Sequence, residues 1–175
     1  MTDVVLIQGS LNTESRTSIL VQHTAQELER AGLKVTVLDL RNIQMEFCDG
    51  RSLKDYHPDL QQAYKTIDKA RAFVIGMPVY CYSVSGPLKN FIDITSGAME
   101  KKFAGILCNA GGNRSYMASA DLSHILAFES HVTTLQPIVF SSYEDFKEKT
   151  LVGEKLQDKI RELVYNLARQ LKSHS

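Results

Sequence analysis

The sequence has no excess of either charge and few cysteines. The chain has 20 lysines and arginines and 20 aspartates and glutamates, so its formal net charge is zero. It therefore lacks the excess of positive charge that binds nucleic acid or an anionic membrane. The three cysteines, Cys48, Cys81 and Cys108, lie far apart without a C-x-x-C, which argues against a disulfide framework or a zinc ribbon. We therefore expect free thiols, no metal site, and small-molecule substrates, with no nucleic-acid or membrane partner.

Long apolar runs are also missing. No stretch approaches the roughly 20 apolar residues that a membrane-spanning helix needs, and no basic segment precedes an apolar one near the N-terminus. Both absences predict a cytoplasmic protein. A chain of 175 residues can bury a core without disulfides or structural metal, so we expect a single domain over residues 1–175.

Two common phosphate-binding motifs are absent as well, G-x-x-x-x-G-K-[ST] and G-x-G-x-x-G, and the first absence argues against nucleotide hydrolysis. Instead, the apolar run at residues 4–7 predicts a buried strand, and the hydroxyl-rich run at 10–18 predicts the start of a helix. Such a junction binds phosphate with backbone N–H groups at the positive end of a helix dipole. The alternative is an ordinary helix cap with a solvated Arg16.

Apolar runs alternate with helical patterns along the rest of the chain. Further strands are expected at 34–40, 72–77, 103–108 and 133–140, and the last helix is expected from about Thr150. This alternation predicts an α/β fold, a flavodoxin-like doubly wound five-stranded parallel sheet of order 2-1-3-4-5 with helices on both faces. Pro137 lies inside the last strand, which suits an edge position. The polar segment 41–57 is too long for an ordinary connection and is either a functional lid or a partner contact.

Two more loops follow central strands of this predicted sheet. Residues 78–87 form a proline-bounded loop with two tyrosines and two serines, which either presents a stiff surface to a flat ring or packs on a neighbouring subunit. Paired glycines after the strand at 103–108 indicate either an anion-binding nest of backbone N–H groups or a plain turn. Because all three loops share the carboxyl edge of the sheet, they are expected to converge on one ligand with a phosphate tail and a flat electron-poor ring. Flavin mononucleotide (FMN) is such a ligand.

Three motifs carry a family resemblance: Gly9-Ser10-Leu11 with Ser15-Arg16-Thr17, Pro78-Val79-Tyr80 with the run 83–89, and Asn109-Ala110-Gly111-Gly112. Together they resemble the NAD(P)H-dependent FMN reductase family, and most closely the flavin-supplying reductases of sulfonate-utilisation systems. The resemblance implies a flavodoxin-like fold, FMN as cofactor, NADPH or NADH as reductant, and a homodimer or homotetramer with the flavin near a subunit boundary.

The resemblance also assigns site residues. Those expected to hold the flavin phosphate are Ser10, Asn12, Ser15, Arg16 and Thr17. Those expected to line the ring are Pro78, Val79, Tyr80, Cys81, Tyr82 and Ser83. Those expected at its pyrimidine end are Asn109, Ala110, Gly111 and Gly112. No side chain is expected to act as an acid or base, because the flavin carries the hydride chemistry, and the backbone N–H groups of Gly111 and Gly112 are expected to stabilise the charge that develops on it.

The expected function is that of an oxidoreductase, an NAD(P)H-dependent FMN reductase that passes reduced flavin to an acceptor. A flavin-dependent monooxygenase is one such acceptor. Alternatives are a quinone, azo-dye or metal-oxyanion reductase with tightly bound FMN, and a flavodoxin-like electron carrier. The neutral charge and the lack of a T-x-T-G-x-T loop disfavour the carrier. A further alternative is a non-catalytic protein that binds a partner through residues 41–57.

Overall fold

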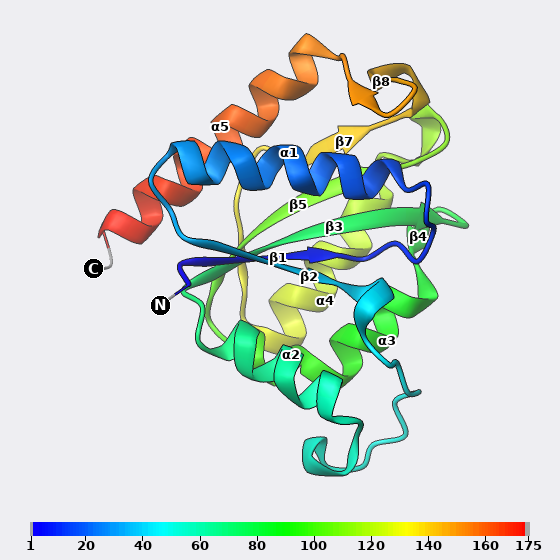
Figure 1. Cartoon of the computed structure of the whole chain (residues 1–175), viewed down its shortest axis with the longest axis vertical. Helices are drawn as coiled ribbons and strands as arrows, with labels where there is room; N and C mark the ends of the chain where they lie inside the picture. Colours follow the sequence, from blue (N-terminus) through cyan, green and yellow to red (C-terminus); the bar gives the residue numbers. More distant parts are fainter. Residues whose placement is uncertain (1, 174–175) are drawn as a thin grey trace.

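The computed structural model describes residues 2–173, which form a mainly parallel sheet with helices on both faces (Figure 1). Its central path runs β2-β1-β3-β5-β6. These strands span Val35–Asp39, Val4–Gln8, Ala72–Tyr80, Phe103–Asn109 and Thr133–Thr134. With β5 and β6 as the fourth and fifth expected strands, the order is the predicted flavodoxin-like one, and the fold prediction is confirmed.

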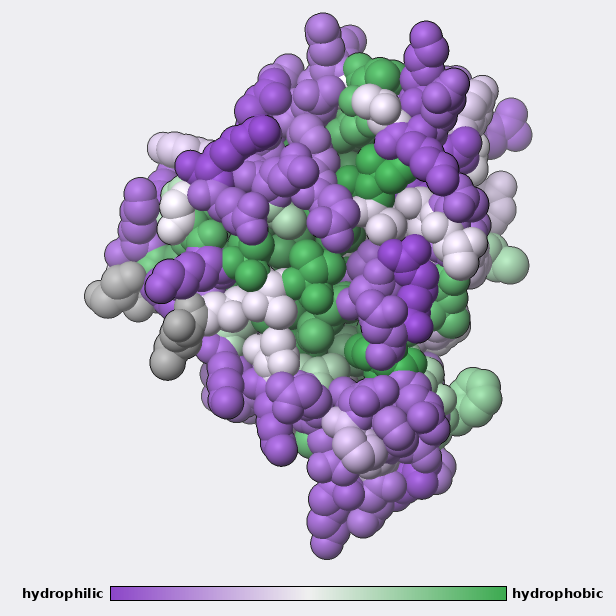
Figure 2. All heavy atoms as spheres, in the orientation of Figure 1, coloured by the Kyte–Doolittle hydropathy of each residue, from purple (hydrophilic) through white to green (hydrophobic). Residues whose placement is uncertain are grey.

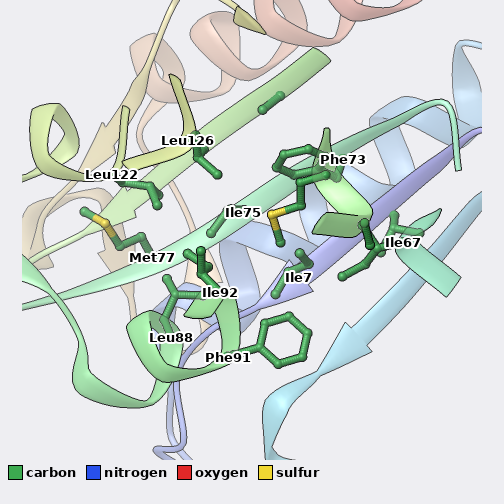
Figure 3. Packing of buried hydrophobic residues seen from close by; sticks show 14 of the residues in the cluster. Ile7, Ile67, Phe73, Ile75, Met77, Leu88, Phe91, Ile92, Leu122 and Leu126 are labelled. Carbon is green, nitrogen blue, oxygen red and sulfur yellow. The ribbon is translucent and has the colours of Figure 1, made fainter. Parts of the chain in front are cut away.

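Five helices cover the two faces of the sheet in the described part of the chain. Helices α1 (Arg16–Arg30) and α5 (Glu154–Ser173) pack side by side on one face (Figure 1). The opposite face carries α2 (Pro58–Asp68), α3 (Gly86–Thr95) and α4 (Ala118–Ser130). Both layers bury apolar clusters against the strands, and Figure 3 shows the cluster beneath α2, α3 and α4. The loops that follow β1, β3 and β5 lie at the carboxyl edge of the sheet, between these two helical layers.

The expected last strand is divided into two. Residues 133–134 form β6 and Val139–Ser141 form β7, and both pair in parallel with β5. The residues between them include Pro137, which has no N–H to donate to a ladder. The edge position that this proline predicted is confirmed, whereas the continuous strand was wrong.

Two other boundaries also differ from expectation. The last helix is confirmed, but it begins at Glu154 and not at about Thr150. A short hairpin of β8 (Phe146–Lys147) and β9 (Thr150–Leu151) comes first, because Phe146 and Leu151 are buried in the cluster that packs α1 and α5 on the sheet. The predicted loop 78–87 is also mostly regular. Strand β3 continues to Tyr80 and pairs with β4 (Ser83–Val84), where Val79 lies opposite Val84, a β-branched pair that suits a strand.

Glycine brings the ends of β1 and β3 together. The amide of Gly9 donates to the carbonyl of Gly76 at 2.9 Å, and a Cβ on Gly9 would lie only 2.7 Å from that oxygen. A Cβ on Gly76 would lie 2.3 Å from a methyl group of Val21 on α1. Both close approaches require glycine. They set the start of α1 directly beside the carboxyl ends of the central strands.

The segment 41–57 packs against α3. The side chain of Asn90 accepts from the amide of Cys48 at 2.8 Å and donates to the carbonyl of Glu46 at 2.8 Å. Tyr56 is buried, and the guanidinium of Arg51 lies 4.3 Å from the centre of its ring. The two hydrogen bonds of Asn90 therefore hold this segment against α3, and the stacked pair lies within the segment. Among residues 2–173, no helix has the length and apolar character to cross a membrane.

Candidate functional site

The loops after β1, β3 and β5 meet in one cavity of about 140 Å³. Its lining residues come from all three: Ser10, Asn12, Glu14, Ser15, Arg16, Thr17, Pro78, Val79, Tyr80, Asn109, Ala110 and Gly111. The structure therefore brings together most of the residues predicted for the site and adds Glu14. Four predicted residues do not line this cavity: Cys81, Tyr82, Ser83 and Gly112. No residue of the segment 41–57 lines it either, so this segment is not a lid over the cavity in this conformation.

The start of α1 supplies hydrogen-bond donors to the cavity. Ser15 is the N-cap, and its hydroxyl accepts from the amide of Ser18 at 3.2 Å. The amides of Arg16 and Thr17 have no acceptor among the residues described. Unpaired N–H groups in a first helical turn carry the positive end of the helix dipole, and they favour a bound anion.

A buried glutamine shapes the loop after β1. Gln8, at the end of the strand, is fully buried. Its side-chain oxygen accepts from the amide of Ser10 at 2.6 Å, and its side-chain nitrogen donates to the carbonyl of Ser10 at 2.8 Å. This two-point contact fixes the backbone of Ser10 where the chain leaves the sheet. Sequence reasoning missed Gln8, although a glutamine at the end of an otherwise apolar strand was a visible signal.

An ion pair at the end of β2 supports the same loop. The Nε of Arg41 donates to Asp39 at 2.9 Å, and the rest of the guanidinium reaches the carbonyl of Thr13 at 3.4 Å and the hydroxyl of Ser18 at 3.3 Å. Gln8 also donates to Asp39 at 3.1 Å. Burial alone would raise the pKa of the Asp39 carboxyl, but the hydrogen bonds from Arg41 and Gln8 hold this pKa below its ordinary value. Asp39 is therefore ionised at neutral pH and neutralised by Arg41.

The second loop reaches the cavity as a β-hairpin. Tyr80 lines the cavity and is half exposed, whereas Cys81 and Tyr82 form the two-residue turn with φ angles of 50° and 62°. Left-handed conformations in two successive residues define a type I′ turn, which glycine and asparagine adopt more easily. The hydroxyl of Ser83 is bound to Asp121 of α4 at 2.6 Å. The two turn residues do not line the cavity, and the hairpin is tied to α4.

The third loop is fixed by a buried serine at the end of β7. The amide of Ala110 donates to the carbonyl of Ser141 at 3.0 Å, and the side chain of Asn109 donates to the Ser141 hydroxyl at 2.9 Å. That hydroxyl donates in turn to the carbonyl of Cys108 at 3.0 Å. The nitrogen of the Asn109 side chain thus positions the loop. Burial raises the pKa of the Cys108 thiol to about 12, so this thiol is not reactive.

The paired glycines leave the backbone open. Neither Gly111 nor Gly112 has a positive φ, and the anion-binding nest of backbone N–H groups stays a prediction. A Cβ on either glycine would meet no atom within 4 Å, and neither amide has an acceptor within residues 2–173. Both N–H groups are consequently free to donate to a ligand.

These features fit FMN. A phosphate finds unpaired amides, hydroxyls and the guanidinium of Arg16 at one end of the cavity. A flat ring finds the half-exposed Tyr80 and the open backbone of Gly111 at the other. The volume of about 140 Å³ is below the roughly 300 Å³ at which ligand pockets begin, so part of the cofactor has to lie outside the cavity.

Known proteins share this sequence pattern and this fold. The NADPH-dependent FMN reductase family matches residues 2–147. An NAD(P)H-dependent FAD/FMN reductase of Geobacillus thermodenitrificans is 30% identical over 165 residues, which cover 92% of this chain and 89% of that protein. An FMN-dependent NADPH-azoreductase of Staphylococcus saprophyticus is 31% identical over 153 residues, or 82% and 79% of the two chains.

A solved oxidoreductase from Corynebacterium diphtheriae superposes with a TM-score of 0.83 at 20% identity, covering 100% of this chain and 99% of that one. This likeness agrees with the fold described above. The family match and the relatives agree on the cofactor and on the reaction. The chain therefore belongs to the NADPH-dependent FMN reductase family, whose members are oxidoreductases that use FMN with NADPH or NADH.

Proposed function

We propose that the cavity between the three loops is the FMN site of this reductase. The convergence of the loops in one cavity carries the proposal. Arg16, the amides of Arg16 and Thr17, and the hydroxyl of Ser10 would hold the phosphate. Tyr80 and the backbone of Gly111 would contact the ring.

FMN, when bound, supplies the redox chemistry, because its ring takes a hydride from C4 of the nicotinamide. The chain contributes binding and orientation. The free N–H group of Gly111, which lines the cavity, is suited to stabilise negative charge that develops on a ring beside it. Glu14 is the one carboxylate in the cavity lining, and it forms an ion pair with Lys149 at 2.7 Å. No side chain needs to act as a general acid or base, because the flavin carries the hydride chemistry.

An assay with added FMN tests this function directly. Purified protein is mixed with FMN, and oxidation of NADPH and then of NADH is followed by absorbance, with the flavin-only background subtracted. We expect FMN-dependent oxidation, and the ratio of the two rates gives the nucleotide preference. FMN binding without oxidation would instead identify an electron carrier, and a protein that neither binds FMN nor oxidises either nucleotide would contradict the proposal.

We also propose that the chain forms a homodimer or homotetramer through α4. This helix is apolar on more than its buried side, with Met117 at its start 62% exposed and Phe128 near its end 82% exposed. Exposed apolar side chains on one helix are the kind of surface that a second copy of the chain covers. Ser83 and Asp121 connect α4 to the hairpin that borders the cavity, so a second copy on this helix would lie near the part of FMN that the cavity does not enclose.

Replacing Phe128 with lysine tests the assembly. Phe128 is mostly exposed, so the variant should fold normally. We expect the sedimentation coefficient to fall towards that of a monomer, with weaker FMN binding. Tyr165→Lys on α5, where the tyrosine is also exposed, is the control. An unchanged coefficient in Phe128→Lys would exclude α4 as the interface.

The flavin-dependent monooxygenase as acceptor, the cytoplasmic location and the single domain over 1–175 stay predictions.

A further inference from the structure

A second and larger cavity lies beside the proposed FMN site. It has a volume of about 770 Å³ and lies between α1 and the β8–β9 hairpin. Its lining residues are Thr13, Glu14, Ser15, Arg16, Ser18, Ile19, Gln22, His23, Gln26 and residues 148–151. Glu14, Ser15 and Arg16 line both cavities. The larger one, here called the α1 groove, therefore begins at the phosphate end of the FMN site. From Ser15 to Gln26 it follows α1 over 11 residues, or about 16 Å.

We infer that the α1 groove binds the adenosine 5′-phosphate half of flavin adenine dinucleotide (FAD), so that the enzyme accepts FAD as well as FMN. The inference rests on the proposed FMN site. FAD is FMN with adenosine 5′-phosphate joined to its phosphate. Any extension from a phosphate held at Ser15 and Arg16 has to leave past these residues, and the groove starts there. Its volume is within the range of about 300–1,000 Å³ of ligand pockets.

The groove carries groups that suit a nucleotide. Gln22 and Gln26 are exposed side-chain amides on α1, which can pair with the hydrogen-bonding edges of adenine. His23 lies among them, and its Nε2 is buried without a partner among the described residues. Burial lowers the pKa of His23, so the ring is neutral at pH 7 and borders the groove without adding a positive charge, while its Nε2 stays buried. Figure 2 shows hydrophilic residues beside hydrophobic patches on the face that carries α1.

The α1 groove also contains a cation, Lys149, for the second phosphate of FAD. Lys149 lines the groove and pairs with Glu14 at 2.7 Å, and both side chains are mostly exposed. An exposed pair of this kind contributes about 0–1 kcal/mol. The ammonium of Lys149 has three donors, so a phosphate between Arg16 and Lys149 can bind it while Glu14 stays paired with it.

NADPH and NADH also contain adenosine 5′-phosphate, but the groove is less suited to them. Their nicotinamide has to reach the flavin ring, which the proposed site places at Tyr80 and Gly111. The α1 groove contains neither residue and leads away along α1. The part of the ligand that meets the groove is therefore the part attached to the flavin phosphate.

Replacing Gln22 with tryptophan tests the inference, because Gln22 lies in the groove, is exposed and does not line the FMN cavity. Dissociation constants of FMN and FAD are measured by fluorescence titration for the wild type, Gln22→Trp and the control Gln62→Trp, where Gln62 is exposed on α2 across the sheet. We expect wild-type protein to bind both flavins. In Gln22→Trp, FAD should bind about tenfold or more weakly, a loss of about 1.4 kcal/mol, with FMN binding unchanged. Gln62→Trp should bind both flavins as the wild type does.

Each other outcome has a definite meaning. Wild-type protein that binds FMN but not FAD would overturn the inference and leave the proposed FMN site intact. FAD affinity that is equal in Gln22→Trp and wild type would exclude the groove. A higher KM for NADPH in Gln22→Trp, with FAD affinity unchanged, would assign the groove to the pyridine nucleotide and overturn the inference. Failure to bind either flavin would overturn both proposals. Gln26→Trp repeats the test one turn further along α1 if Gln22→Trp does not fold.

Discussion

Arg16 provides the sharpest test of the phosphate end of the FMN site. Arg41 is paired with Asp39, and Lys149 is paired with Glu14. In residues 2–173, no carboxylate lies within 4.0 Å of the guanidinium of Arg16. Arg16 is thus the cation that lines the cavity with its charge uncompensated. Replacing it with alanine should weaken FMN but leave riboflavin, which has no phosphate, nearly unaffected.

The expected size of the effect follows from the exposure of Arg16. A hydrogen bond to a charged group contributes about 1.5–3 kcal/mol, but Arg16 is exposed and solvent screens part of its interaction. We therefore expect a loss of about 1–2 kcal/mol, or roughly 5- to 30-fold in the dissociation constant of FMN. The amides at the start of α1 remain in the variant, so binding should not vanish.

Fluorescence titration of FMN and riboflavin against wild type and Arg16→Ala measures this difference. Arg114→Ala is the control, because Arg114 is exposed in the third loop and does not line the cavity. Raising the ionic strength should reduce the difference between wild type and Arg16→Ala, since salt screens exposed charges. Equal losses for FMN and riboflavin, or no loss for FMN, would show that Arg16 does not bind the phosphate.

Three further predictions concern the structure around the site. Gly9→Ala should lower the free energy of unfolding by about 1–3 kcal/mol, measured by urea denaturation, because its Cβ would lie 2.7 Å from the carbonyl of Gly76; wild-type stability would contradict the close approach. Gly111→Val should weaken the binding of FMN and riboflavin without changing the urea midpoint, since a Cβ at this position meets no atom within 4 Å. Unchanged dissociation constants in the fluorescence titration would show that Gly111 is not part of the site. Asp39→Asn should cost stability at pH 7, because the hydrogen bonds that lower the Asp39 pKa stabilise the carboxylate. This stabilisation is present above the pKa of Asp39 in the unfolded chain, about 3.9, and is lost as the pH falls through the lower pKa of the folded protein. The difference in free energy of unfolding between wild type and Asp39→Asn should therefore disappear in acid. A difference that is independent of pH would contradict the ion pair.

The sequence predicted those parts of the site that depend on strand ends. Apolar runs separated by helical patterns indicate a parallel sheet, and parallel strands place the loops after β1, β3 and β5 at one edge. Ser10, Arg16 and Gly111 were therefore predictable as neighbours in space, and the cavity contains all three. Local chain direction was less predictable. Residues 78–84 form a hairpin because Val79 and Val84 pair, and Cys81 and Tyr82 form its turn outside the cavity lining.

The supporting contacts were not predictable, because they join residues distant in the chain. Gln8 and Asp39 are 31 residues apart, and Asn109 and Ser141 are 32 apart. Neither pair has a sequence spacing that signals contact. Each becomes adjacent only when parallel strands set their ends at the same level, as the pairings of β1 with β2 and of β5 with β7 do.

The charges around the phosphate end explain how an anion can bind beside two carboxylates. Asp39 supports the loop after β1 through Gln8, and an unpaired carboxylate there would repel a phosphate. Arg41 neutralises it, and Lys149 does the same for Glu14. The field that remains is that of Arg16 and the first turn of α1, both favourable to an anion. A chain with no net charge thus concentrates positive potential at one point, so binding at this point does not depend on a basic protein surface.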